Sequence, residues 1–196
     1  MVLERININK EKLDALEHDI LLRRHIERYA IVRQYVYGKV VDCACGVGYG
    51  TYLLSKNPDV RKIYGVDLDK TAIETASAEF GSEESISFLQ GDFESLAIED
   101  VDVLISLETI EHCQNPEVIA DFVLRCNAQE VIISFPSKIT THYNPYHLWD
   151  ITPQNVIDIF SKSHTLLNNF SYTFDTQFLH FIKHHRKISF PKRFKG

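Results

Sequence analysis

A glycine-rich turn between a predicted strand and a predicted helix constrains the fold of this chain more than any other feature. Residues 40–50 read VVDCACGVGYG, with a glycine at every second position from 46 to 50. The apolar run before the turn predicts a strand over residues 40–44, and the pattern after it predicts a helix over 49–56. Glycine allows a sharp turn and a close ligand approach, and the N–H groups that open the helix favour a negative ligand group. The turn therefore predicts a ligand-binding edge on an α/β sheet.

The rest of the chain alternates between strand and helix patterns. Residues 10–37 carry apolar residues at helical spacing, which predicts one or two helices. Further strands are expected over residues 62–67, 86–90, 101–107 and 130–135, and helices over 70–80, 116–127 and 153–161. Such alternation is typical of a parallel sheet covered by helices on both faces. The last two strand candidates, 164–170 and 174–181, are too close in sequence for a crossover and must pair antiparallel.

The predicted fold class is α/β, with a doubly wound, mostly parallel seven-stranded sheet and a C-terminal antiparallel hairpin. The 196 residues, of which 44% are hydrophobic, suffice for one buried core but not for two ordinary domains. We divide the chain into an N-terminal helical lid (1–37), a ligand-binding domain (38–182) and a basic tail (183–196). The tail holds six Lys or Arg residues and no acid. We interpret it as a solvated terminus, although such a segment can also bind an anionic partner such as a nucleic acid.

Cysteine usage and hydropathy predict a cytoplasmic protein. The four cysteines, Cys43, Cys45, Cys113 and Cys126, form no CxxC pair, so we expect reduced thiols. The chain has no run of 18 apolar residues, so no membrane span is expected. Its first residues are charged and mixed and lack the apolar stretch of a signal peptide.

Acidic residues at two later strand ends suit the contacts of an adenosine. Asp67 ends the second predicted strand, 21 residues after Gly46, where a carboxylate can accept both ribose hydroxyls. The sequence GDF follows the third strand, so Asp92 can bind the adenine amino group while Phe93 packs against the ring. A dinucleotide fingerprint would place Gly or Ala where Thr51 stands, and this departure disfavours NAD or FAD.

These motifs resemble those of the class I S-adenosylmethionine-dependent methyltransferases. The matching stretches are HIERY at 25–29, VDCACGVGYG at 41–50, YGVDL at 64–68, GDF at 91–93 and LETIEH at 107–112. The chain looks most similar to small members that tailor sugars and glycans. The resemblance implies a seven-stranded sheet and S-adenosylmethionine as cofactor, with Asp42 and the glycine turn holding the methionine part. The cofactor-binding residues expected on this basis are Arg28, Tyr29, Asp42, Cys45, Gly46, Gly48, Tyr49, Asp67, Leu68, Asp92, Phe93, Leu107 and Glu108.

An acidic and histidine-containing segment ends the fourth predicted strand. Glu108, Glu111 and His112 are spaced i, i+3, i+4, so on a helical turn they would share one face beside the ligand crevice. His112 could act as a general base assisted by Glu111. Alternatively, Glu108, Glu111, His112 and His147 could bind Mg²⁺, Mn²⁺ or Zn²⁺, or the cluster could be structural. The Glu-x-x-Glu-His pattern resembles that of ubiquinone-pathway O-methyltransferases and small-RNA 3′-end 2′-O-methyltransferases, in which such residues bind a metal.

Two flanking segments could complete the site. His25, Arg28 and Tyr29 share one face of the first helix, and Arg28 could pair with the methionine carboxylate of the cofactor. The loop over residues 137–150 contains three aromatic residues and could form a wall of the acceptor pocket.

We therefore expect an enzyme that O-methylates a small hydroxylated acceptor such as a sugar, with His112 as the base. One alternative is a metal-dependent RNA 2′-O-methyltransferase whose basic tail binds phosphates; the acidic body argues against it. The other alternative is a non-catalytic nucleoside-binding module that retains the fold.

Overall fold

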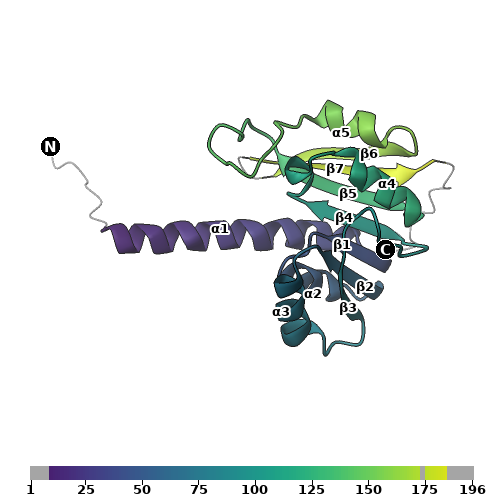
Figure 1. Cartoon of the computed structure of the whole chain (residues 1–196), viewed down its shortest axis with the longest axis horizontal. Helices are drawn as coiled ribbons and strands as arrows, with labels where there is room; N and C mark the ends of the chain where they lie inside the picture. The colour runs from purple at the N-terminus through teal and green to yellow at the C-terminus, as the bar shows by residue number, and fades with distance from the viewer. Residues whose placement is uncertain (1–8, 173–174, 185–196) are drawn as a thin grey trace, which may run out of the picture.

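Seven strands form one mixed sheet, and the ends of five parallel strands meet at a common edge (Figure 1). The computed structural model describes residues 9–172 and 175–184. The elements are α1 (Lys10–Val32), η1 (Arg33–Tyr35), β1 (Gly38–Cys43), α2 (Tyr49–Ser55), β2 (Val60–Asp67), α3 (Lys70–Phe80), β3 (Ile86–Gln90), β4 (Val103–Leu107), η2 (Ile110–His112), α4 (Glu117–Arg125), β5 (Glu130–Pro136), α5 (Pro153–Phe160), β6 (His164–Tyr172) and β7 (Thr176–Lys183). The sheet order is β3-β2-β1-β4-β5-β7-β6.

The predicted fold class is confirmed. Strands β1 to β5 are parallel, whereas β7 pairs antiparallel with both β5 and β6, as expected for the C-terminal hairpin. The predicted helix at 70–80 and strand at 86–90 have the bounds of α3 and β3. The predicted strand at 101–107 begins two residues too early, because the Val101 N–H bonds the Cys126 carbonyl instead of a neighbouring strand. Most of the expected basic tail, residues 185–196, lies outside the described residues.

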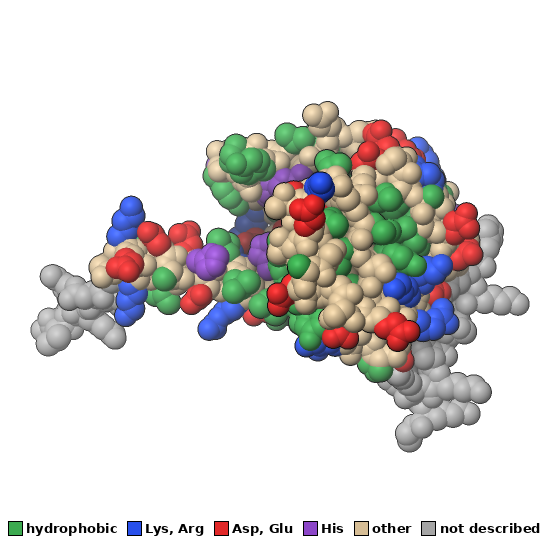
Figure 2. All heavy atoms as spheres, turned by 60° about the horizontal axis from the view of Figure 1, so that its bottom comes forward, with side chains coloured by type: hydrophobic (Ala, Val, Ile, Leu, Met, Phe, Trp, Pro, Cys, Tyr) green, Lys and Arg blue, Asp and Glu red, His purple; other side chains and the backbone are tan. Residues whose placement is uncertain are grey.

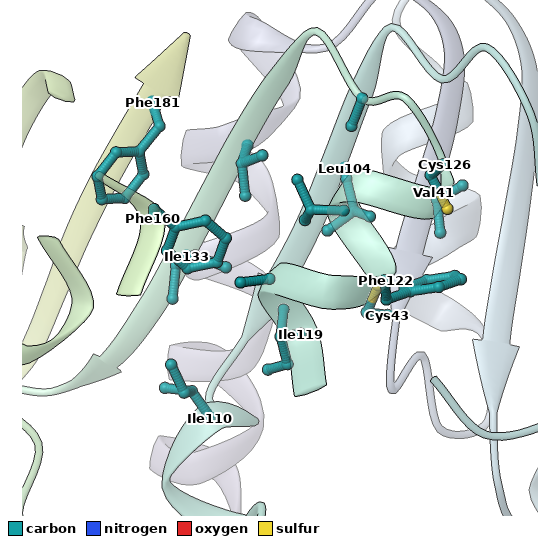
Figure 3. Packing of buried hydrophobic residues seen from close by; sticks show 14 of the residues in the cluster. Val41, Cys43, Leu104, Ile110, Ile119, Phe122, Cys126, Ile133, Phe160 and Phe181 are labelled. Carbon is teal, nitrogen blue, oxygen red and sulfur yellow. The ribbon is translucent and has the colours of Figure 1, made fainter. Parts of the chain in front are cut away.

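Helices cover both faces of the sheet because successive strand residues point to opposite sides. On β1, Val41 and Cys43 belong to the cluster that contains Phe122 of α4 and Phe160 of α5 (Figure 3). Val40 belongs to the cluster on the other face, which also holds Val32 of α1 and Leu54 of α2. Each fully buried aliphatic or Phe side chain contributes about 1.5–3 kcal/mol to folding. The two cores together fix the strand ends that carry the candidate site.

Helix α1 projects from the body beside this edge (Figures 1 and 2). Its 23 residues correspond to about 34 Å at 1.5 Å per residue, and within it only Tyr29 and Val32, near its C-terminal end, are buried. An ion pair of 3.2 Å between Arg24 and Asp175 also ties α1 to the start of β7. Neither α1 nor any other helix within residues 9–172 and 175–184 combines the length and apolar character needed to cross a membrane.

Candidate functional site

The glycine turn leaves β1 in a backbone conformation that suits close approach. Gly46 and Gly48 have φ values of 54° and 83°, in the left-handed region that glycine tolerates. A Cβ at Gly48 would lie 2.7 Å from the Phe88 ring, and one at Gly50 would lie 2.0 Å from the Tyr29 ring. A Cβ at Gly46 would meet no atom within 4 Å, so the turn faces open space there. Because the glycines carry no Cβ, the turn packs closely against the Phe88 and Tyr29 rings, while Gly46 remains accessible to a ligand.

Asp42 supports this turn from inside the protein. Its carboxylate is fully buried and accepts hydrogen bonds from the Tyr29 hydroxyl at 3.3 Å and the Thr51 hydroxyl at 2.7 Å. Burial raises the pKa of Asp42 to about 7, although both hydroxyl donors act in the opposite direction. Asp42 therefore connects α1 and α2 through its bonds to Tyr29 and Thr51. Thr51, which stands where a dinucleotide fingerprint would have Gly or Ala, holds the Asp42 carboxylate in place.

A cavity of about 210 Å³ lies between the turn and the C-terminal part of α1. It is lined by His25, Arg28, Tyr29, Ala44, Cys45, Gly46, Tyr49, Leu107 and Glu108. The structure thus brings together seven of the expected cofactor-binding residues, together with His25, whose Nδ1 lies 3.0 Å from the Tyr49 hydroxyl. Ala44 was not expected from the sequence; it adopts a φ of 55° at the end of β1, and no sequence pattern indicates this.

An anion and a cation face each other in this cavity. Glu108 and Arg28 form an ion pair of 3.4 Å, while the Ser134 hydroxyl donates to Glu108 at 2.8 Å and Arg28 donates to the Thr176 hydroxyl. Burial raises the pKa of Glu108, and the Arg28 guanidinium partly offsets this effect. A free amino acid carries one ammonium and one carboxylate, so this pair offers complementary charge to the methionyl end of the expected cofactor.

The ends of β2 and β3, here called the shelf, lie beside the cavity, because Gly46 of its lining is bonded to Asp67 at the end of β2. Asp67 accepts the Gly46 N–H at 2.8 Å through Oδ2 and the Asp69 N–H at 2.9 Å through Oδ1, and the neighbouring Leu68 is 69% exposed. Carboxylate oxygens have further lone pairs, so Asp67 can still accept ribose hydroxyls. The exposed side chain of Leu68 on this shelf can cover a nucleoside.

Asp92 and Phe93 lie at the far end of this shelf. Asp92 Oδ1 accepts the backbone N–H groups of Glu94 and Ser95. Hydrogen bonds from the Ser95 side chain, first, and then from these backbone groups lower the pKa of Asp92. Phe93 stacks on Phe122 at a ring separation of 5.4 Å, so one of its sides belongs to the core. The residues present therefore fit S-adenosylmethionine, with charged groups at one end and the acidic strand ends at the other.

The acidic and histidine-containing segment divides into two parts. Glu108 has a φ of 51°, and this left-handed conformation turns it into the cavity. Glu111 and His112 instead lie in the short helix η2, where Glu111 is 1% exposed. The expected common face of the three residues is therefore wrong, because the backbone of Glu108 departs from a helical turn.

The structure brings Glu111 and His112 together with His147 of the later loop. One possible ligand atom from each lies within 4.8 Å of the others, and Glu108 is outside this group. His112 Nδ1 lies 2.8 Å from the Tyr146 carbonyl oxygen, and since a carbonyl only accepts, Nδ1 carries the proton. In the neutral ring, Nε2 therefore keeps a lone pair, and it lies 4.0 Å from Glu111 Oε1. The carbonyl of Tyr146, rather than an acid, orients the ring.

Glu111 is a buried carboxyl group without a hydrogen-bond partner among the described residues at either oxygen. Burial, with a further contribution from Glu108, raises its pKa to about 8. Desolvation and His112 lower the pKa of His147, against the opposite effect of Asp150, so the neutral ring of His147 is favoured. The group formed by Glu111, His112 and His147 can therefore accept protons or hydrogen bonds, or ligate a cation. Figure 2 shows histidine side chains beside the hollow between α1 and the body.

Known proteins share both the domain and the fold. Residues 41–134 match the family model described as a methyltransferase domain, whereas the search of curated proteins gave no match. The N-methyltransferase NodS from Bradyrhizobium japonicum WM9, in complex with S-adenosyl-l-homocysteine, is similar in structure, with 14% identity and a TM-score of 0.68 over 82% of this chain and 86% of that chain.

Two further solved structures have the same architecture. Magnesium protoporphyrin IX methyltransferase from Synechocystis PCC 6803, with bound S-adenosyl-l-homocysteine, has 14% identity and a TM-score of 0.64 over 92% of this chain and 90% of that chain. The complex of the Haloferax volcanii Trm112 methyltransferase activator with a putative methyltransferase matches at 17% identity and a TM-score of 0.65, over 79% and 86%. The matched segment runs from β1 into β5 and contains the glycine turn, so the chain holds a methyltransferase domain with the fold of S-adenosylmethionine-dependent enzymes, and S-adenosylmethionine is its cofactor.

Proposed function

We propose that this enzyme transfers the methyl group to a hydroxyl of a small acceptor, with His112 as the general base. The observation that carries the proposal is the bond from His112 Nδ1 to the Tyr146 carbonyl, which leaves Nε2 as a proton acceptor. The Glu111 carboxyl lies 4.0 Å from that nitrogen and assists the base. A hydroxylated acceptor, such as a sugar, supplies the hydrogen-bond donors that these groups lack. The four free thiols fit a cytoplasmic location.

The cofactor-binding residues have distinct roles in this proposal. Arg28 binds the methionyl carboxylate and Glu108 the ammonium, so the ion pair between them opens on binding. Asp67 holds the ribose hydroxyls and Asp92 the adenine amino group, while α1 acts as a lid over the methionyl end. When bound, the cofactor supplies an electrophilic methyl group on a sulfonium sulfur. The protein holds the acceptor hydroxyl in line, excludes water and moves the proton to His112 Nε2.

The test compares His112→Ala with His18→Ala, a change at an exposed histidine on α1 outside the cavity. Loss of a general base lowers kcat by about 10²–10⁴-fold. We expect this loss in His112→Ala with unchanged affinity for S-adenosylhomocysteine, and full activity in His18→Ala. Full activity of His112→Ala would refute the assignment of the base.

A divalent cation is a second candidate occupant of the group formed by Glu111, His112 and His147. It is favoured by the ligand-atom separations within 4.8 Å and by the unpaired carboxylate of Glu111. Two imidazoles and one carboxylate suit Zn²⁺ or Mn²⁺ better than Mg²⁺, which prefers oxygen ligands. Activity that disappears on chelation and returns with one ion would replace the simple base by a metal site, whereas full activity in the chelated enzyme would exclude the metal.

A further inference from the structure

The loop over residues 137–150, between β5 and α5, is attached to the segment that carries the candidate base. The Leu148 N–H donates to the Glu111 carbonyl at 2.8 Å, and the indole N–H of Trp149 donates to the Cys113 carbonyl at 2.8 Å. The Tyr146 carbonyl accepts the bond from His112. These three bonds attach the loop to residues 111–113.

The apolar side chains of the same loop point to solvent. Their exposed fractions are 65% for Ile139, 67% for Tyr143, 74% for Tyr146, 47% for Leu148 and 46% for Trp149. Surface loops normally expose polar side chains, and clustered apolar exposure marks a binding surface. This cluster of exposed apolar side chains therefore indicates that they contact a ligand.

Other exposed apolar side chains lie beside the cofactor cavity. Of the sixteen large apolar residues that are exposed in the described part of the chain, five lie in the loop, and Ile26 lies on α1 within the stretch that lines the cavity. Val47 and Leu68 lie on the cofactor turn and its shelf. In Figure 1 the loop lies at the end of the sheet from which α1 projects. The ligand of the loop therefore belongs to the reaction site.

The chemistry of the site limits what this ligand can be. Beneath the loop, His112 Nε2 offers a lone pair that needs a hydrogen donor, and the Glu111 carboxyl has no hydrogen-bond partner among the described residues. At the rim, Tyr143, Tyr146 and Trp149 offer ring faces, which pack best on another planar apolar group. A complementary ligand carries a hydroxyl at one end and an aromatic ring at the other.

We propose that the loop 137–150 binds an aromatic ring of the methyl acceptor and thereby directs the acceptor hydroxyl to His112. This inference deepens the proposed O-methyltransferase function and rests on it for the role of the hydroxyl. The occupant is the acceptor rather than another protein chain, because the bonds of the loop to residues 111–113 join its apolar rim directly to the proton-accepting group.

Trp149 is the single tryptophan of the chain and reports binding without turnover. We would titrate the protein saturated with S-adenosylhomocysteine with phenyl β-glucoside and with methyl β-glucoside, which share their ring hydroxyls. We expect a saturable change in Trp149 fluorescence for both, with a Kd about tenfold lower for the phenyl compound, as for a modest apolar contact in a pocket. Equal affinities, or no saturable change with either compound, would overturn the proposal.

Two leucine variants provide a matched control. Leu148 in the loop and Leu124 on α4 are 47% and 52% exposed. Leu124 lies two residues before Cys126, whose carbonyl bonds Val101 at the start of the segment that leads into β4, away from the loop. We expect Leu148→Ala and Tyr146→Ala to raise the Kd of phenyl β-glucoside at least threefold, with little effect on methyl β-glucoside, and Leu124→Ala to change neither. Preserved selectivity in both loop variants would contradict the proposal.

The titration separates the failure of this inference from that of the proposed function. If the phenyl compound binds selectively but only amines are methylated, the loop assignment stands and the hydroxyl nucleophile is wrong. If hydroxyl groups are methylated with equal KM in both glucosides and in the loop variants, the enzyme is an O-methyltransferase and the loop assignment is wrong.

Discussion

The substitution Glu111→Gln should reduce the dependence of folding stability on pH. Burial raises the pKa of Glu111 from its ordinary value of 4.5 to about 8. In this range the folded protein keeps a proton that the unfolded chain releases, so the wild-type free energy of unfolding falls as the pH rises from 4.5 to about 8. Glutamine has the same shape and no titration, so this contribution disappears in the variant.

The magnitude follows from the size of the pKa difference. Each pKa unit corresponds to about 1.4 kcal/mol, so the wild type should lose about 3 kcal/mol relative to the variant between pH 5 and pH 8. The buried amide of Gln also lacks partners and costs about 1–3 kcal/mol, but that cost is the same at every pH. We therefore predict how the difference in free energy of unfolding between the variant and the wild type changes with pH, and not which protein is more stable at one pH.

Urea denaturation of both proteins at pH 5, 6.5 and 8, in the presence of a chelator, measures this difference. Asp42 also has a raised pKa, but it is present in both proteins and cancels. A difference between variant and wild type that stays constant with pH would refute the conclusion that Glu111 is an unpaired buried carboxyl.

Three further predictions concern the cofactor. S-adenosylhomocysteine should raise the Tm of the protein, since it binds the folded state, and NAD should not; thermal shift measurements decide this. Arg28→Ala should raise the Kd of S-adenosylhomocysteine about 10–100-fold through loss of a charge-assisted bond, whereas the control Arg23→Ala, at an exposed residue of the same helix, should leave the Kd unchanged. Titration calorimetry measures both values, and equal Kd values for the two variants would refute the role of Arg28. Asp67→Ala should cost about 1–3 kcal/mol of cofactor affinity by leaving ribose hydroxyls unpaired, and unchanged affinity with an intact fold would move the ribose site elsewhere.

Local patterns predict the sheet and its glycine turn well because apolar periodicity and glycine positions report directly on burial and turns. The helix over 70–80 begins after Asp69, whose side chain accepts two helix N–H groups, and its N-terminal bound is therefore readable. The bounds of the predicted strand at 174–181 are less accurate, because β7 runs from Thr176 to Lys183. The connection before it includes residues outside the described part. Pairing of the hairpin was nevertheless predictable from its short connection.

The arrangement of the candidate site is less accessible from sequence. Helical spacing places Glu108 with His112, but a single left-handed residue at the end of β4 separates them. The partner that orients His112 is the carbonyl of Tyr146, and a backbone atom leaves no sequence signal. The approach of His147 depends on the path of a loop closed by bonds from Thr140 and Thr141 to Asp150, which is a tertiary feature.

The identity of the methylated atom tests the central claim most directly. The enzyme would be incubated with S-adenosylmethionine labelled with ¹³C in the methyl group and with a panel of hydroxylated, amine and thiol acceptors, and heteronuclear NMR of the product would locate the label. Our account predicts a methyl group on oxygen, formed by the wild type and lost in His112→Ala. A methyl group on nitrogen or sulfur, or undiminished O-methylation by His112→Ala, would contradict it.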